Sequence, residues 1–336
     1  MRPPYRVPVQ TEPRDLDRTA LTDALARHWG IHGVRLEYLP VGYGSHHWQA
    51  VAADGSRWFV TADALGAGAL TGRSPDDGFA TLDRAFRTAV TLHGAGLEFV
   101  QAPIPSRDGS ILHRVGSGYA IRVEAFVEGT AEGSGEFGRP EQRRQVARLI
   151  GRLHAASATV PHGLPRREDF ALAGREALGE ALGDLDTAWE HGHFAEPARA
   201  LLRANADGVR GRLRAHDRLA QRVRDHPEPW VVTHGEPHSA NLIRQPDGGL
   251  RLVDWDTTLI GPRERDLWVI LDADRTGWHE YCEATGVSSL NEEALGLYRE
   301  RWALAEICEY VAEFRRPHGE TDDTRSSWEI LGDYLQ

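Results

Sequence analysis

Apolar and polar residues alternate over several short runs in the first third of the chain. Residues 34–39, 45–52 and 57–60 follow this pattern, and a glycine loop and a tight turn separate them. Two further strand-like runs follow at 110–115 and 118–127. Alternation with a period of two is typical of strands that bury one face. The N-terminal part of the chain is therefore predicted to be rich in strands.

Elsewhere the apolar residues recur every three to four positions, which predicts helices with one buried face. The helices are expected at about 18–29, 81–92, 141–158, 171–189, 197–224, 263–274, 290–315 and 325–334. Most of them lie in the second half, so the chain is predicted to change from a strand-rich to a helical part.

Residues 230–267 interrupt these helices with a mixed pattern. A short apolar run leads into a loop, and two strand-like runs then flank a turn at 246–249. Two such runs predict a hairpin, which would return the chain so that Asp254 lies beside Asn241. Glu236 precedes the hairpin, so three oxygen-bearing side chains are predicted to lie together.

A carboxylate, an amide and a second carboxylate suit phosphoryl transfer. In that reaction one residue orients the attacking hydroxyl, while an Asn and an Asp hold Mg²⁺ against the nucleotide phosphates. Mg²⁺ takes oxygen ligands and keeps several waters, so one amide and one carboxylate are enough from the protein. Glu236 and Asn241 stand five residues apart, which is the separation of Asp and Asn in a kinase catalytic loop.

In this stretch the sequence resembles the aminoglycoside phosphotransferase family, whose members are related to protein kinases. Within the family, the spectinomycin phosphotransferase branch is the most similar. The residues that carry the resemblance are His234–Gly235–Glu236, Asn241, Asp254–Trp255–Asp256 and Gly261–Pro262–Arg263–Glu264–Arg265–Asp266–Leu267.

The resemblance implies an α+β, two-lobed, protein-kinase-like fold. Residues 1–123 would form an N-terminal nucleotide-binding lobe with a mostly antiparallel sheet, and residues 124–129 would form a hinge. Residues 130–336 would form a helical C-terminal lobe with the catalytic loop and the substrate site.

The resemblance also implies a role for each polar residue of the catalytic motif. Glu236 would be the catalytic carboxylate, and Asn241 and Asp254 would bind Mg²⁺. His234 and Asp266 would support the catalytic loop without a chemical role.

The co-substrate implied by the resemblance is ATP or GTP. Gly42, Gly44 and Ser45 would cover its phosphates, because backbone N–H groups can approach closely where no Cβ intervenes. The Ala125 carbonyl and the Val127 N–H would bind the adenine edge from the hinge.

One feature of the kinase pattern is missing, because the chain contains no lysine. The nucleotide-binding position where the resemblance expects a lysine is Thr61, and Asp83 stands where its glutamate partner is expected. Arg84 and Arg87 are candidate substitutes, because a guanidinium can bind phosphate through two N–H groups. Simple surface exposure is the alternative for both arginines.

The acidic residues of the chain concentrate near its end, since residues 255–336 hold 18 Asp and Glu against 8 Arg. Glu306 and Glu309 share one face of a predicted helix with Trp302. Together with Asp256, they are candidates for binding a cationic substrate, and an acidic face exposed to solvent is the alternative.

Composition restricts the other function classes. The net charge of −11 argues against nucleic acid, whose phosphates demand a basic surface. No apolar run approaches the ~20 residues that a membrane-spanning helix needs, and two cysteines cannot form a disulfide framework. A cytoplasmic protein that binds a small molecule is therefore expected.

A zinc enzyme is a competing interpretation of the His-x-Glu sequence at His234 and Glu236. Its remaining ligands would be a closely spaced cysteine pair, but Cys282 and Cys308 are 26 residues apart. The glycine and proline that flank Glu236 also exclude the helical two-histidine site of a metalloprotease.

The function predicted from the sequence is nucleotide-dependent O-phosphorylation of a small cationic substrate. An aminoglycoside or aminocyclitol antibiotic is the expected substrate, in resistance or self-protection. A pseudokinase-like ligand-binding protein is an alternative, because Thr61 and Glu236 stand where Lys and Asp are expected. A kinase of a small sugar or amino alcohol is another.

Overall fold

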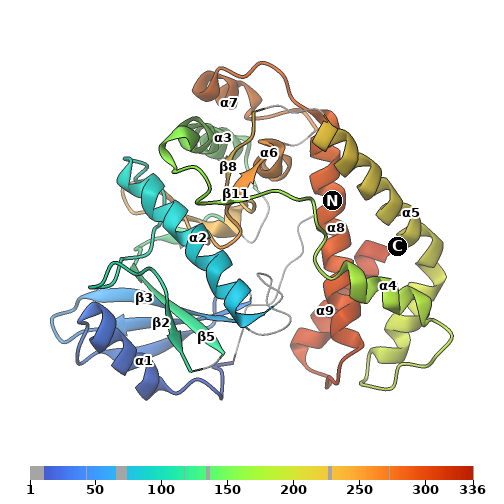
Figure 1. The fold of residues 1–336 in the computed structure, drawn as a ribbon, viewed down its shortest axis with the longest axis horizontal. Helices are drawn as coiled ribbons and strands as arrows, with labels where there is room; N and C mark the ends of the chain where they lie inside the picture. The colour runs from blue at the N-terminus through green and yellow to red at the C-terminus, as the bar shows by residue number, and fades with distance from the viewer. Residues whose placement is uncertain are drawn as a thin grey trace. The chain divides into compact units, whose positions relative to one another are not determined.

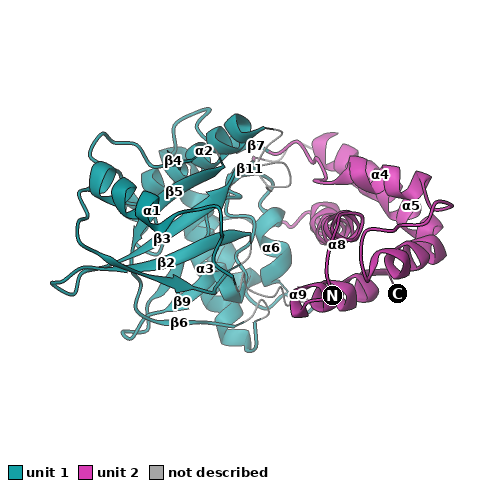
Figure 2. Ribbon diagram, turned by 90° about the horizontal axis from the view of Figure 1, so that it is seen from below, with its two compact units in different colours: residues 1–167, 231–288 teal, residues 168–230, 289–336 magenta. Residues whose placement is uncertain are grey.

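A computed structural model describes residues 11–42, 44–65, 74–116, 118–133, 137–225, 229–271 and 273–335. Most of the proline-rich stretch at residues 1–14 lies outside the described residues, as does Ser117 between the strand-like runs 110–115 and 118–127. The chain divides into two compact units, residues 1–167 with 231–288 and residues 168–230 with 289–336 (Figure 2). The predicted hinge, residues 124–129, lies inside the first unit.

An antiparallel five-stranded sheet forms one part of the first unit, with the strand order β1-β2-β3-β5-β4 (Figure 1). The strands are β1 (Arg35–Leu39), β2 (Ser45–Val51), β3 (Arg57–Ala64), β4 (His113–Val115) and β5 (Tyr119–Ala125). All five were predicted, with β4 and β5 shorter than expected.

One face of this sheet is apolar and packs on the first helix. Trp48, Val60 and Ile121 are fully buried in the same cluster as Leu21 and Leu25. Each large apolar side chain buried in this way stabilises the fold by about 1.5–3 kcal/mol.

The first helix begins and ends close to its predicted bounds. It consists of α1 (Arg18–Ala24) and a π-helical turn (Leu25–Trp29). The Asp17 carboxylate accepts the Thr19 N–H as its N-cap, and Gly30 ends the turn in the left-handed conformation.

The helix α2 (Pro75–Gly94) covers the other face of the sheet (Figure 1). It begins several residues before the predicted start, because its first turn carries polar capping residues and no apolar periodicity. The Ser74 side chain accepts the Asp77 N–H, and Pro75 occupies the first turn, as expected at a helix N-terminus. Leu82, Phe86 and Leu92 are its largest buried side chains.

The rest of the first unit holds the predicted hairpin and several helices. The hairpin pairs Leu250 with Arg244 and Leu252 with Leu242, which confirms the predicted pairing. The elements of this part of the first unit are α3 (Pro140–Ala155), β6 (Thr130–Ala131), β7 (Arg166–Arg167), β8 (Val231–Thr233), β9 (Leu242–Arg244), β10 (Leu250–Leu252), β11 (Leu259–Gly261), α6 (Glu264–Ile270) and α7 (Trp278–Thr285). The hairpin consists of β9 and β10.

The sequence did not predict β6, β7, β11 or α7, and α6 ends four residues before its predicted end. Strands of two or three residues carry no readable periodicity. They form here because longer elements hold their neighbours in place.

The second unit is helical within its described residues. It contains α4 (Arg175–Gly183), α5 (Ala195–Asp225), α8 (Glu292–Phe314) and α9 (Asp322–Leu335). Leu202, Val209, Leu304, Val311 and Phe314 are buried in one cluster, so α5 and α8 pack along an apolar seam. No helix in the described part of the chain is both long and apolar enough to span a membrane.

Candidate functional site

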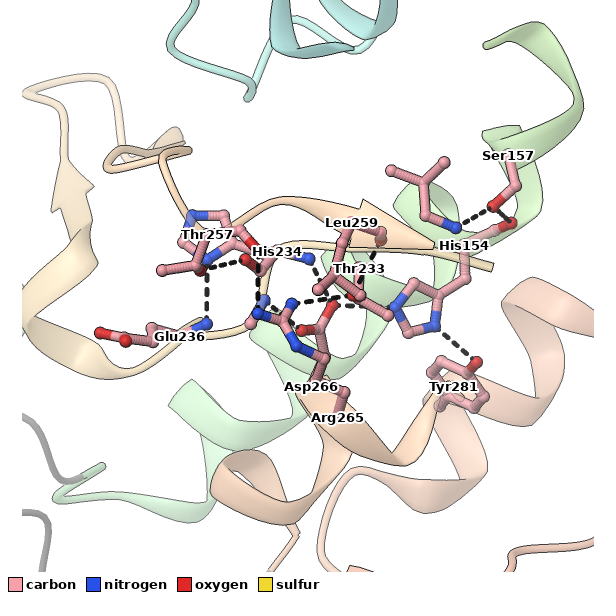
Figure 3. A network of polar contacts seen from close by, with 12 residues as sticks. His154, Ser157, Thr233, His234, Glu236, Thr257, Leu259, Arg265, Asp266 and Tyr281 are labelled. Atoms are coloured by element: carbon pink, nitrogen blue, oxygen red, sulfur yellow. Dashed lines mark hydrogen bonds and ion pairs between the residues drawn. The ribbon is translucent and has the colours of Figure 1, made fainter. Parts of the chain in front are cut away.

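Asp266 holds the loop that follows β8 in place (Figure 3). Its fully buried carboxylate accepts the backbone N–H of His234 at 2.9 Å and that of Gly235 at 2.6 Å. A third contact, at 2.9 Å, comes from His154 Nε2. Burial alone would raise the pKa of Asp266, but the hydrogen bond and the charge of His154 lower it. The carboxylate therefore stays ionised and fixes the loop backbone.

His154 is a supporting residue that the sequence analysis missed. It is buried on α3, and its Nδ1 lies 2.7 Å from the hydroxyl of Tyr281 on α7. A hydrogen bond at each ring nitrogen sets the direction in which His154 faces Asp266. The available signal was a histidine next to Leu153, at the edge of the apolar face of a predicted helix.

His234 joins the loop to the hairpin. Its Nε2 lies 2.9 Å from the Val253 carbonyl, and its Nδ1 accepts the Glu236 N–H at 3.2 Å. These two bonds require a neutral ring with its proton on Nε2. Burial lowers the pKa of His234 to about 4, so the ring remains neutral near pH 7.

Gly235 is required by the close approach of Arg265. Its φ is +104°, and a Cβ at this position would lie 2.4 Å from the guanidinium of Arg265. That guanidinium donates to the Thr233 hydroxyl at 2.9 Å and to the Thr257 carbonyl at 2.8 Å. The Thr257 hydroxyl donates to the His234 carbonyl at 2.7 Å. A side chain at position 235 would displace this arginine and loosen the loop (Figure 3).

Glu236, Asn241 and Asp254 come together as predicted. The Asn241 amide donates to the Glu236 carbonyl at 3.0 Å, and the Val253 N–H donates to the Asn241 carbonyl at 3.0 Å. Asp254 adopts a left-handed backbone with φ +67°, a conformation that costs energy for a residue other than glycine. The hairpin therefore holds the backbone next to Asp254 against Asn241.

The carboxylates near this point repel one another. Asp254 reaches solvent but is surrounded by protein atoms, and desolvation followed by the charge of Glu236 raises its pKa to about 6. Desolvation, Asp254 and Glu236 also raise the pKa of Asp256. Glu236, Asp254 and Asp256 thus share one region of strongly negative potential.

This donor set fits a magnesium ion. The Asn241 amide nitrogen bonds the loop, which leaves its oxygen to act as a ligand, and a divalent cation would relieve the repulsion between the carboxylates. Within the described residues, His28, Asp108 and His113 are the one group of three or more ligating side chains within 4.8 Å. The Glu236 region therefore offers two protein ligands rather than a closed cage, as is usual for Mg²⁺ bound with phosphates.

The group formed by His28, Asp108 and His113 does not suit one metal ion. The two imidazole rings are stacked, with centroids 3.6 Å apart and an interplanar angle of 20°. A metal lies in the plane of each ring that ligates it, so two stacked rings cannot both point at the same ion.

The glycine loop between β1 and β2 has the backbone that its sequence suggested. Gly42 and Gly44 have φ +72° and +83°, and a Cβ on Gly42 would lie 2.9 Å from His47 Nε2. The Ser45 hydroxyl donates to the Asp63 carboxylate at 2.7 Å. The backbone groups of Gly42 and Gly44 are therefore placed to cover a ligand, whereas the Ser45 hydroxyl is already bonded.

Thr61 and the hinge residue Ala125 are already engaged by other groups. Thr61 is fully buried, and its hydroxyl lies 3.1 Å from His47 Nδ1. The Ala125 carbonyl accepts the side-chain amide of Gln101 at 2.9 Å, which leaves one lone pair. Val127 lies beyond the end of β5 and is half-buried.

Arg84 and Arg87 lie on the exposed side of α2. Arg84 is exposed, and Arg87 forms an ion pair with Asp83 at 2.7 Å, one turn away on the same helix. Neither arginine points from α2 into the sheet, where the expected lysine would stand. The buried cation of the sheet is Arg122, which the sequence analysis missed.

In the second unit, the three residues predicted to share one face of a helix, Trp302, Glu306 and Glu309, are all buried or half-buried. Glu306 is 1% exposed, so a solvated acidic face is wrong for this position. Trp302 donates its indole N–H to the Tyr334 hydroxyl at 3.1 Å, and Glu309 is half-buried. The sequence analysis missed Glu168, whose buried carboxylate pairs with Arg301 at 2.7 Å.

The comparisons with known proteins agree with this geometry. The model of the phosphotransferase enzyme family, APH, matches residues 47–304. Protein StrN of Streptomyces griseus is 30% identical over 265 residues, which cover 75% of this chain and 76% of StrN. Two solved structures share the fold over 95% of both chains. They are spectinomycin phosphotransferase APH(9)-Ia in complex with ADP and spectinomycin, with a TM-score of 0.71 at 15% identity, and a microcompartment-associated aminopropanol kinase, with 0.62 at 14%.

The length of the family match and the identity to StrN establish the family, and the structural neighbours confirm the predicted α+β, protein-kinase-like fold. The chain therefore belongs to the phosphotransferase enzyme family, APH, and is a phosphotransferase.

Proposed function

We propose that this enzyme transfers the γ-phosphoryl group of ATP or GTP to a hydroxyl of a small cationic substrate. The observation that carries the proposal is the position of Glu236, whose backbone is held by His234 and Asn241 beside Asp254. About a third of the Glu236 side chain is exposed, so a substrate hydroxyl can reach a carboxylate whose backbone does not move.

Glu236 would orient the attacking hydroxyl and accept its proton. A bond then forms between that oxygen and the γ-phosphorus, the bond to the bridging oxygen breaks, and the nucleoside diphosphate leaves with the electron pair. Such a transition state is loose, so positioning contributes more than proton abstraction. A glutamate can therefore perform a task for which kinases use aspartate.

Asn241 and Asp254 are the residues that would hold Mg²⁺, which neutralises phosphate charge when bound. The N–H groups of the loop at Gly42 and Gly44 would cover the phosphates from the other side. Asp266 and His154 act only through the loop, because their polar atoms are used in bonds to one another and to the backbone.

A cationic substrate is favoured by the acidic residues of the chain. Asp256 adds to the negative potential around Glu236, and Glu306 and Glu309 of α8 add carboxylates in the second unit. Two structural neighbours are named for spectinomycin and aminopropanol, which both carry amino and hydroxyl groups. We infer an aminoglycoside or aminocyclitol substrate, with resistance or self-protection as the outcome of its phosphorylation.

A substrate panel tests the proposal. Aminoglycosides, spectinomycin, simple amino alcohols and uncharged sugars would each be incubated with the enzyme, Mg²⁺ and either ATP or GTP. Mass spectrometry should detect one added phosphate on at least one cationic member and none on the uncharged sugars. Tight binding of Mg²⁺ and nucleotide with no phosphorylated product from any member would contradict the proposal.

A further inference from the structure

A single arginine lies buried on the polar face of the five-stranded sheet. Arg122 of β5 is 4% exposed and stands directly opposite Thr61 of β3 in the strand register. Directly opposed residues of antiparallel strands project to the same face. The side chain of Arg122 therefore lies beside that of Thr61. Thr61 occupies the position on β3 where a kinase carries its lysine, and Arg122 is on the neighbouring strand.

The two faces of β5 differ in chemistry. Ile121 and Val123 are fully buried in the apolar cluster that contains α1. Arg122 points to the opposite face, where its guanidinium lies 4.1 Å from the centre of the Phe86 ring on α2. The cation is thus enclosed between the sheet and α2, on the same face as Ser45 at the end of the glycine loop, since Ser45 and Arg122 both bond Asp63.

Two carboxylates orient this guanidinium. It pairs with Asp63 of β3, and its Nε donates to Glu124 at 3.1 Å. Burial opposes the charge of Arg122, but Asp63 and Glu124 raise its pKa above the ordinary value. The charged form of Glu124 remains unfavourable in this position, because burial raises the pKa of Glu124 and Arg122 only partly offsets the increase.

Such an arrangement is a poor way to stabilise a fold. Burying three charges carries a desolvation penalty that their mutual attraction often fails to recover, and apolar replacements are often as stable. Three buried ionisable groups on a sheet whose other face is apolar therefore point to a role in binding. The end of β5 is tied to the hairpin through Gln101, whose side-chain amide donates to the Ala125 carbonyl at 2.9 Å and whose backbone N–H donates to the Leu252 carbonyl at 3.0 Å.

We propose that Arg122 supplies the cation that binds the nucleotide phosphates, in place of the lysine that this chain lacks, and that Asp63 and Glu124 aim it. This inference rests on the proposed phosphotransferase function. A guanidinium can donate two parallel N–H groups to phosphate oxygens, so one arginine from β5 can perform this task. Arg84 and Arg87, on the exposed side of α2, are then not required.

The test compares nucleotides that differ only in their phosphates. Calorimetry with Mg²⁺ would measure the binding of ATP and adenosine to the unmodified enzyme and to Arg122→Met, Arg122→Lys and Arg87→Met. Arg122→Met should weaken ATP binding roughly 10- to 100-fold and leave adenosine binding unchanged. Arg122→Lys should fall between the two, and Arg87→Met should match the unmodified enzyme.

Two further variants separate binding from folding. Removing Arg122 alone leaves Asp63 and Glu124 unpaired, so Asp63→Asn, Arg122→Met and Glu124→Gln would also be combined in one neutral variant. That variant should have a melting temperature close to that of the unmodified enzyme, yet bind ATP as weakly as Arg122→Met does. Thr61→Lys added to Arg122→Met moves the cation back to β3 and should recover part of that affinity.

A neutral variant that folds and binds ATP as tightly as the unmodified enzyme would overturn the inference. So would equal weakening of ATP and adenosine binding by Arg122→Met and Arg122→Lys. If the unmodified enzyme binds neither ATP nor GTP with Mg²⁺, the proposed function itself fails, and the variants are not needed to show it. The two failures are therefore distinguishable.

Discussion

Two buried charged groups in the first unit are held in opposite ways. Asp266 is surrounded by hydrogen-bond donors, namely two backbone N–H groups and His154. Arg122 is instead held by the side chains of Asp63 and Glu124. Donors from the backbone fix the course of the chain, whereas side-chain carboxylates leave the backbone unaffected and direct a charge. Asp266 therefore fixes the backbone of the loop after β8, whereas Arg122 is proposed to bind the nucleotide phosphates.

The largest effect is expected at Asp254, the proposed metal ligand. Asp254→Ala should abolish the dependence of nucleotide binding on Mg²⁺, because Asn241 alone cannot hold the ion. Calorimetry with and without Mg²⁺ measures this, and Asp247→Ala in the turn of the same hairpin is the control. Identical ATP affinity with and without Mg²⁺ in the unmodified enzyme would contradict the metal assignment.

Asp266→Asn should reduce the free energy of unfolding by about 2–4 kcal/mol, because an uncharged amide cannot accept all three donors. The folded-state pKa of Asp266 is lowered, so its stabilisation is present above the unfolded-state pKa and is lost as the pH falls through the folded-state value. Urea unfolding at pH 7 and at acid pH checks this. Asp207→Asn, at an exposed position on α5, is the control, and an equal effect of the two substitutions would refute the scaffold role.

The catalytic hairpin could be predicted from the sequence, whereas the partners of Arg122 could not, and the reason is physical. Glu236, Asn241 and Asp254 lie within 19 residues, and turn residues between short apolar runs predicted how the hairpin brings them together. Arg122 meets Thr61 and Asp63 only through the register of two strands that are nearly 60 residues apart along the chain. A sequence pattern fixes which face a residue occupies but not its partner across the sheet.

The helices show the same limit. The apolar face of α3 was readable from Val146, Ile150 and Leu153, but the partner of His154 on α7 was not, because α7 is short and has little periodicity. Glu306 was predicted on the correct helix, with exposure to solvent as the alternative. Its burial depends on how the helices of the second unit pack, and local spacing does not contain that information.

A smaller effect is expected at His47, whose pKa depends on the charges of Arg122 and Asp63. Burial, followed by the charge of Arg122, lowers its pKa to about 4 against the opposing charge of Asp63. The unfolded chain takes up a proton below about pH 6.5 while the folded chain does not, so stability should fall by roughly 2–3 kcal/mol between pH 6.5 and 4. His47→Gln should flatten this dependence, whereas His279→Gln, at an exposed position, should leave it intact. An unchanged slope in His47→Gln would show that the ring is charged in the fold.

The smallest effect is expected in the second unit, at Glu309. Glu309→Gln should weaken the binding of a cationic substrate by about 1 kcal/mol or less, because a partly exposed charge is screened. Isothermal titration at low salt checks this against Glu329→Gln, an exposed position on α9. If the unmodified enzyme, Glu309→Gln and Glu329→Gln bind the substrate equally well at low ionic strength, Glu309 does not take part in substrate binding.

The most direct test of the account is the rate of a single turnover with and without the Glu236 carboxylate. Enzyme in excess over ATP would be mixed with a substrate identified from the panel, and the phosphorylated product would be followed by rapid quench and mass detection. Glu236→Gln should slow this step by roughly 10²–10⁴-fold while leaving ATP affinity and melting temperature unchanged, because His234 and Asn241 bond only the backbone of residue 236. An unchanged single-turnover rate in Glu236→Gln would contradict the assignment of this residue as the catalytic carboxylate.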